Sequence, residues 1–146
     1  YAICTSEKFS ENIKKMILYT ANGISTPTQW AGTAALTGPQ DCIAAMLAAY
    51  RERRDLLFAG VNKTDFLTCK VAPRGAFYVY AQITENWKGS AWDLSNYLID
   101  QYSLGAIPGD IFYDDTPSIR FAYACKTEMV RRAIDTLASA GKPAQV

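Results

Sequence analysis

Residues 105–124 have the sequence GAIPGDIFYDDTPSIRFAYA, and this stretch decides how the rest of the chain is interpreted. A short apolar run breaks at Pro108-Gly109, an acidic turn reverses the chain, and a strand is expected to follow. One arginine, Arg120, lies between Ile119 and Phe121 in that strand. Arginine is permanently charged and presents a planar fork of donors that fits a carboxylate through two parallel hydrogen bonds. Arg120 is therefore the first candidate for a binding residue.

The strand by itself leaves two interpretations of Arg120 open. Charged side chains are mostly exposed, so Arg120 could be an edge-strand residue that contacts only solvent. Alternation along a strand, however, places it on one face with Ser118, Ala122 and Ala124. These small neighbours leave room for a ligand beside the guanidinium. We predict that Arg120 binds a carboxylate, and that the Pro-Gly turn before it either ends a strand or brings backbone close to a ligand.

Composition narrows the classes of function. The chain has 146 residues, 49% hydrophobic and 20% charged, which is typical of a globular protein with a core. Its net charge is +1 with the signs interspersed, so nucleic acid is not an expected partner. The absence of histidine excludes Ser-His and Cys-His nucleophiles and nearly all zinc sites. Apolar runs are far shorter than the ~20 residues of a membrane helix, so no membrane association is expected.

Cysteine spacing indicates the compartment. Cys4, Cys42, Cys69 and Cys125 are far apart and show none of the paired spacings of a metal or disulfide framework. Their apolar or helical surroundings predict buried free thiols. We therefore expect a protein of a reducing, cytoplasmic compartment, without a metal site.

Hydrophobic residues recur at helical spacing up to residue 60. Capping residues and glycine stops bound three expected helices, at 5–22, 25–38 and 41–60. The third is long, and its apolar stripe is interrupted by the charged block 51–55. We expect it to join two parts of a larger body.

Beyond residue 60 the hydrophobic period changes toward that of strands. Residues 66–71 and 76–83 are rich in β-branched and aromatic residues and flank a Pro-Arg-Gly turn, which predicts an antiparallel pair. Aromatic residues there, including Tyr78 and Tyr80, are expected to pack in the core and sheet. The remaining expected elements are a helix opening at the Ser90-Asp93 capping box, strands at 105–108 and 118–124, and a helix that Thr127 caps and that Gly141 and Pro143 end.

Several motifs occur in the order of a known family. They include PRGAFY at 73–78, LGAIPGDIF at 104–112 and IRFAYA at 119–124, preceded by STPTQWA at 25–31 and YRERRD at 50–55. Their order and spacing resemble the C-terminal part of the class I/II aminotransferases, which are pyridoxal-phosphate enzymes of fold type I. The resemblance covers nearly the whole chain.

The resemblance implies an α/β fold in three parts. Residues 1–38 would be the tail of a large cofactor-binding domain, 39–60 a long connecting helix, and 61–146 a small C-terminal domain of α+β type, with an antiparallel sheet covered by helices. Arg120 falls on the family's arginine that binds the substrate α-carboxylate. The resemblance also implies pyridoxal 5'-phosphate in the full-length protein, amino-acid and 2-oxo-acid substrates, and a homodimer. Tyr113 departs from a frequent glycine and Ala122 from a frequent serine.

The resemblance places the covalent chemistry upstream of this chain. In the family, the lysine that binds the cofactor and an arginine on the cofactor phosphate precede a Gly-Tyr pair whose second member matches Tyr1. The chain also opens at Tyr1 without methionine, so we expect an inactive fragment that holds no catalytic residue. No lysine present has the apolar, cleft-like setting that Schiff-base chemistry needs. These lysines are Lys8, Lys14, Lys15, Lys63, Lys70, Lys88, Lys126 and Lys142.

Two other classes of function stay open, because a fold does not settle a reaction. Within the fold, the parent protein could be a C–S lyase, a decarboxylase, a synthase or the effector domain of a transcription regulator. Outside it, residues 60–146 could form an independent α+β ligand-binding module without catalysis.

Overall fold

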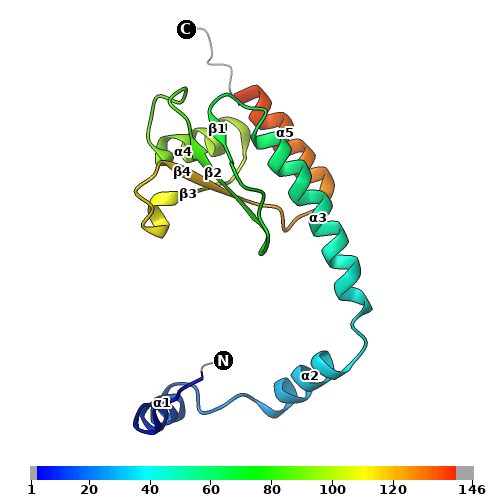
Figure 1. Cartoon of the computed structure of the whole chain (residues 1–146), viewed down its shortest axis with the longest axis vertical. Helices are drawn as coiled ribbons and strands as arrows, with labels where there is room; N and C mark the ends of the chain where they lie inside the picture. Colours follow the sequence, from blue (N-terminus) through cyan, green and yellow to red (C-terminus); the bar gives the residue numbers. More distant parts are fainter. Residues whose placement is uncertain (1–2, 141–146) are drawn as a thin grey trace. The chain divides into compact units, whose positions relative to one another are not determined.

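The structure of the chain is a computed structural model that describes residues 3–140 (Figure 1). Its contacts divide the chain into two units, Tyr1–Cys42 and Ile43–Val146. The expected helix stop at Gly141 and Pro143 lies outside the described residues.

The first unit contains two helices, α1 (Glu7–Thr20) and α2 (Thr26–Thr37). Ser6 caps α1 through a side-chain hydrogen bond to a backbone amide, and Gly23, with a φ of 91°, follows the end of the helix. Neither helix buries a residue. These helices therefore carry apolar side chains without a core of their own.

The second unit is built on a four-stranded antiparallel sheet in the order β1-β2-β4-β3. Its longest pairing joins β2 to β4. The first strand is much shorter than predicted, because the backbone of Cys69 bonds to the side chain of Asn62 instead of to a strand, at 2.8 and 3.0 Å. The strands are β1 (Leu67–Thr68), β2 (Tyr78–Ile83), β3 (Ile107–Pro108) and β4 (Ser118–Ala122).

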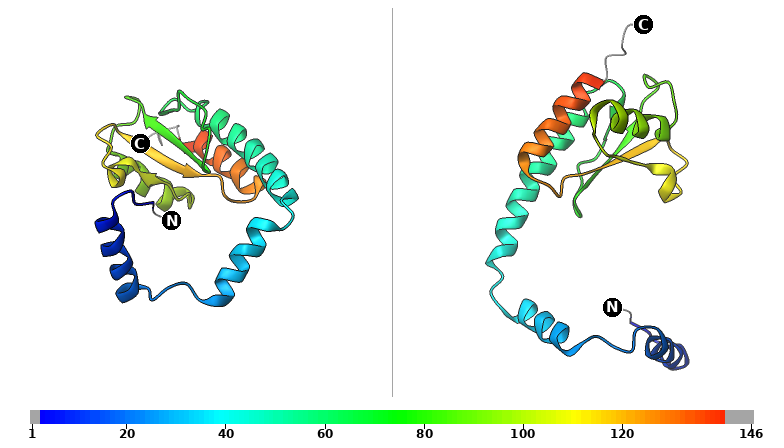
Figure 2. Two further views of the ribbon diagram at one scale, coloured as in Figure 1. Left: turned by 60° about the horizontal axis from the view of Figure 1, so that its bottom comes forward. Right: turned by 180° about the vertical axis from the view of Figure 1, so that it is seen from behind.

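Three helices build the core against one face of this sheet. Buried side chains of the helices, such as Leu57, Leu94 and Leu137, join Val79 and Ile119 of the strands in a single cluster. Helices α3 and α5 run side by side (Figures 1 and 2). The helices are α3 (Asp41–Val61), α4 (Ala91–Tyr102) and α5 (Thr127–Ala140).

The predicted fold class, a small antiparallel sheet covered by helices, is confirmed. The capping box at Ser90 and Asp93 is also present, with Ser90 donating to the Asp93 carboxylate at 2.7 Å. All four cysteines are free thiols, but the prediction that they are buried is wrong for Cys42, which is exposed, and holds fully only for Cys69. Across residues 3–140, no helix combines the length and apolar character needed to cross a membrane.

Trypsin is expected to cut the first unit before the second. Helices of 14 and 12 residues that bury nothing are marginal in water, whereas α5 is held by its buried residues. Limited digestion should therefore cleave the exposed Lys14-Lys15 pair in α1 well before the exposed Arg131-Arg132 pair in α5. Mass spectrometry of the early fragments measures the order. Simultaneous cleavage at the two pairs would contradict the prediction.

Candidate functional site

Arg120 lies on the face of the sheet opposite the core, in the middle of β4. The strand register places Tyr80 of β2 on one side of it and Ile107 of β3 on the other. Its neighbours Ile119 and Phe121 are buried in the core, so alternation directs the Arg120 side chain away from the core. This is the alternation that the sequence predicts.

Two aromatic rings contact the guanidinium of Arg120. Its central carbon lies 4.2 Å from the ring centroid of Tyr78 and 4.4 Å from that of Phe112. Tyr78 belongs to β2, and Phe112 ends the 3-10 helix η1 (Gly109–Phe112) that follows β3. One ring therefore comes from β2, which flanks β4, and the other comes from the 3-10 helix that follows β3. Each such contact contributes about 0.5–1 kcal/mol at a partly exposed site and narrows the conformations that the side chain samples.

The N–H donors of Arg120 remain available to a ligand. Within residues 3–140, no hydrogen bond or ion pair engages its guanidinium. Arg54, by contrast, binds Asp55 at 2.7 Å. A half-buried arginine that aromatic rings hold in place, and that no carboxylate of these residues occupies, is suited to a carboxylate supplied by a ligand.

A cluster of three oxygen-bearing side chains lies next to Arg120 on the same face. The Tyr80 hydroxyl donates to Oδ2 of Asp114 at 2.8 Å. The Ser118 hydroxyl lies 2.8 Å from the Tyr80 hydroxyl and 2.9 Å from the same carboxylate oxygen. The other carboxylate oxygen, Oδ1 of Asp114, accepts a hydrogen bond from the backbone amide of Thr116 at 2.9 Å. This bond closes the acidic turn predicted from the sequence.

Hydrogen bonding and burial shift two pKa values in this cluster. The pKa of Asp114 is lowered, first by the Thr116 amide and then by the Tyr80 and Ser118 hydroxyls, because these donors stabilise the charged carboxylate. The pKa of Tyr80 is raised, mainly because removal from water disfavours the phenolate, and further by the nearby negative charge of Asp114. At neutral pH the cluster therefore holds an ionised aspartate and a neutral tyrosine.

The Pro108-Gly109 turn approaches the same two hydroxyls. A Cβ at residue 109 would overlap Oγ of Ser118 and the hydroxyl oxygen of Tyr80. The glycine is thus required by close approach of backbone to these side chains. This contact supports the structural interpretation of the turn over the interpretation as a ligand-binding loop.

Comparison with known proteins decides the family. Residues 1–137 match the family model described as aminotransferase class I and II. The chain belongs to the class I and II aminotransferases. The resemblance inferred from its motifs is therefore confirmed.

Individual aminotransferases match most of this chain. The aspartate aminotransferase of Rhizobium meliloti (strain 1021) is 32% identical over 142 residues, which cover 89% of this chain and 34% of that protein. The LL-diaminopimelate aminotransferase of Syntrophobacter fumaroxidans is 32% identical over 117 residues, covering 80% and 29%. The crystal structure of the Rhizobium meliloti aspartate aminotransferase aligns with a TM-score of 0.75 at 30% identity, over 90% of this chain and 35% of that chain. The chain thus spans about a third of the length of the curated relatives it matches.

Tyr113, which departs from a glycine frequent in aminotransferases, occupies a backbone conformation that favours glycine. Its φ of 58° and ψ of 34° are left-handed, and its side chain is 96% exposed. For a residue with a Cβ, the left-handed conformation costs about 1 kcal/mol. Tyr113 therefore adopts a left-handed conformation despite its Cβ, and its aromatic ring lies in solvent. Ala122, the second departure, is exposed at the end of β4.

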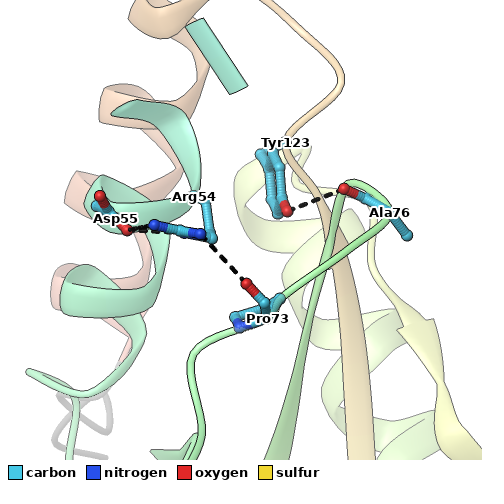
Figure 3. A network of polar contacts seen from close by, with 5 residues as sticks. All are labelled: Arg54, Asp55, Pro73, Ala76 and Tyr123. Carbon is cyan, nitrogen blue, oxygen red and sulfur yellow. Dashed lines mark hydrogen bonds and ion pairs between the residues drawn. The ribbon is translucent and has the colours of Figure 1, made fainter. Parts of the chain in front are cut away.

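The YRERRD segment of this aminotransferase chain anchors the turn before β2 (Figure 3). Arg54 in α3 binds Asp55 and donates to the carbonyl of Pro73 at 3.4 Å. From β4's side, the Tyr123 hydroxyl donates to the carbonyl of Ala76 at 3.2 Å. These contacts fix the residues that lead into β2, and so the start of the strand that carries Tyr78.

The described residues do not fit the attachment of pyridoxal phosphate that the aminotransferase family implies. Every lysine within residues 3–140 is exposed at the surface. Lys142 lies outside the described residues. In residues 3–140, no group of His, Cys, Asp and Glu side chains is placed to hold a metal ion.

Three residues around Arg120 were not predicted as part of its site. Tyr78 and Tyr80 were expected to pack in the core and sheet, and Phe112 had no predicted role. In the structure Tyr78 is half-buried and Tyr80 is 36% exposed, both on the face of Arg120. The period of 2 in β2, with Val79 and Ala81 on the other face, is the signal that could have placed the two tyrosines.

The shifted pKa of Asp114 gives a test of the cluster. A carboxyl whose folded pKa is lowered contributes stability above its ordinary pKa of about 3.9, and this contribution is lost as pH falls through the folded value. NMR titration of the carboxyl carbon should find a pKa below the ordinary value, and Ser118→Ala should move it upward because one donor is removed. Ser139→Ala, in the last turn of α5, is the control. An unchanged Asp114 titration in Ser118→Ala would contradict the assignment.

Proposed function

We propose that the full-length protein containing this chain is a pyridoxal-phosphate-dependent aminotransferase that moves an amino group between an amino acid and a 2-oxo acid. The donor amino acid becomes a 2-oxo acid and the acceptor 2-oxo acid becomes an amino acid, so the exchange needs no external oxidant or reductant. Family membership supports the reaction class. Pyridoxal phosphate, when bound, supplies the electron sink for this chemistry.

We assign Arg120 the role of binding the substrate's α-carboxylate. Its half-buried guanidinium, held against Tyr78 and Phe112 with its donors available, is the observation that carries this assignment. Two parallel hydrogen bonds would fix the carboxylate and thereby orient the α-carbon for reaction. Because the rings restrict Arg120 before the ligand arrives, less conformational entropy is lost on binding.

We also propose the three-part division for the full-length protein. Residues 1–38 would belong to the large cofactor-binding domain, 39–60 to the connecting helix, and 61–146 to the small domain. The apolar side chains of α1 and α2, none of them buried, support packing of these helices against the rest of a large domain. The catalytic lysine would be supplied upstream of Tyr1. A homodimer follows the family pattern, and a cytoplasmic location is consistent with the free thiols.

Replacing Arg120 in the full-length enzyme tests the assignment. Arg120→Lys keeps the charge but loses the planar fork, so the KM for the amino acid should rise by a factor on the order of 100, or about 2.7 kcal/mol, while bound cofactor is retained. Steady-state kinetics with L-aspartate and other amino acids measure the change, and visible absorbance measures the cofactor. Arg131→Lys, at an exposed position of α5, is the matched control.

Two outcomes would contradict these proposals in different ways. Unchanged kinetics in Arg120→Lys would refute the carboxylate-binding role while leaving the enzyme class intact. A full-length wild-type protein without visible absorbance, and without a spectral change on adding amino acids, would refute the enzyme and favour a non-catalytic binding module.

A further inference from the structure

Phe112 contacts Arg120 but has few contacts within its own segment, which comprises residues 109–114. Its side chain is 42% exposed, and it ends a 3-10 helix of a single turn. Tyr113 follows in a left-handed conformation with its side chain in solvent. The position of the Phe112 ring over Arg120 therefore depends on contacts that hold the ends of this segment.

Both ends of the segment are held by the same two hydroxyls. At its start, the backbone of Gly109 packs closely against the hydroxyls of Ser118 and Tyr80. At its other end, the carboxylate of Asp114 bonds to these hydroxyls at 2.9 and 2.8 Å. Tyr80 and Ser118 lie on neighbouring strands of the sheet, so they are rigid supports. The cluster thus closes the segment onto the sheet.

Tyr80 links this cluster to Arg120 in two further ways. It lies directly opposite Arg120 in the register of β2 and β4. Its ring also meets the ring of Phe112 edge-on, with the centroids 6.4 Å apart. One residue therefore bonds to Asp114 through its hydroxyl, contacts Phe112 through its ring and neighbours Arg120 through the backbone.

We propose that Tyr80, Ser118 and Asp114 act as a clasp that positions Phe112 over Arg120 and so sets how tightly the substrate carboxylate is bound. The three are positioning residues, since they act through Phe112 and Arg120 rather than on the substrate. This inference rests on the proposed carboxylate-binding role of Arg120. Opening the clasp releases Phe112, and Arg120 then samples more conformations before a ligand binds.

Two single substitutions in the full-length enzyme open the clasp with little change of volume. Tyr80→Phe removes the hydroxyl and keeps the ring, and Asp114→Asn removes the charge. Each should raise the KM for the amino acid about fivefold with little change in kcat. A change of this size is expected when one cation–π contact is lost. Matched controls are Tyr113→Phe, whose hydroxyl is in solvent, and Asp115→Asn, at an exposed neighbouring carboxylate. The controls should leave KM unchanged.

A double substitution separates a positioning role from general weakening. If the clasp acts through Arg120, Tyr80→Phe should raise KM in the wild-type background but add almost nothing in the Arg120→Lys background. Independent, multiplicative losses in the two backgrounds would overturn the proposal, because they would show that Tyr80 acts on binding by another route.

Amide hydrogen exchange on the chain 1–146 provides a readout that does not need activity. Tyr80→Phe should accelerate exchange at the amides of Tyr113 and Thr116, which bond within the segment and its turn, and leave Val79 and Phe121 unchanged. Acceleration at all four amides would overturn the clasp in favour of global destabilisation.

The kinetic outcomes also distinguish this inference from the proposed function. If Arg120→Lys raises KM but Tyr80→Phe behaves like Tyr113→Phe, only the clasp is refuted. If Arg120→Lys itself leaves KM unchanged, the carboxylate-binding role fails, and the clasp fails with it.

Discussion

The pairing of β2 with β4 is the constraint on which the rest of the second unit depends. Its register runs from Tyr78 opposite Ala122 to Gln82 opposite Ser118. Because side chains alternate along a strand, moving β4 by one residue would expose Ile119 and turn Arg120 toward the core. Burying an unpaired guanidinium costs several kcal/mol. The register that builds the core is therefore the same one that presents Arg120 to a ligand.

Local sequence signals were sufficient wherever one short segment determines the structure. The period of 2 around Arg120 assigned its face, because Ile119 and Phe121 have to be buried. The capping box at Ser90 predicted the start of α4, since its hydrogen bonds join residues three apart. The family was inferred from the order and spacing of several motifs, because no single residue indicates it.

Contacts between segments that are distant in the sequence could not be predicted from such local signals. The bond from Tyr80 to Asp114 joins residues 34 apart, and the contact of Phe112 with Arg120 requires the turn after β3 to fold back over the sheet. The backbone at position 113 is left-handed, but a tyrosine gives no sequence signal for this conformation, whereas a glycine would have given one. The shortened β1 arises likewise from a side chain, Asn62, that replaces a strand as the partner of Cys69.

The one-sided covering of the sheet also bears on the local dielectric around Arg120. Two unit charges 4 Å apart attract by about 1 kcal/mol in water and by about 4 kcal/mol at the effective dielectric constant of 20 that is typical near a protein surface. On an open, hydrated face, much of the attraction between a guanidinium and a carboxylate is lost to solvent. If another layer of protein excluded water from this face, the attraction between Arg120 and a carboxylate would become stronger without any movement of the arginine. The affinity of Arg120 is thus as much a property of what encloses it as of the strand that carries it.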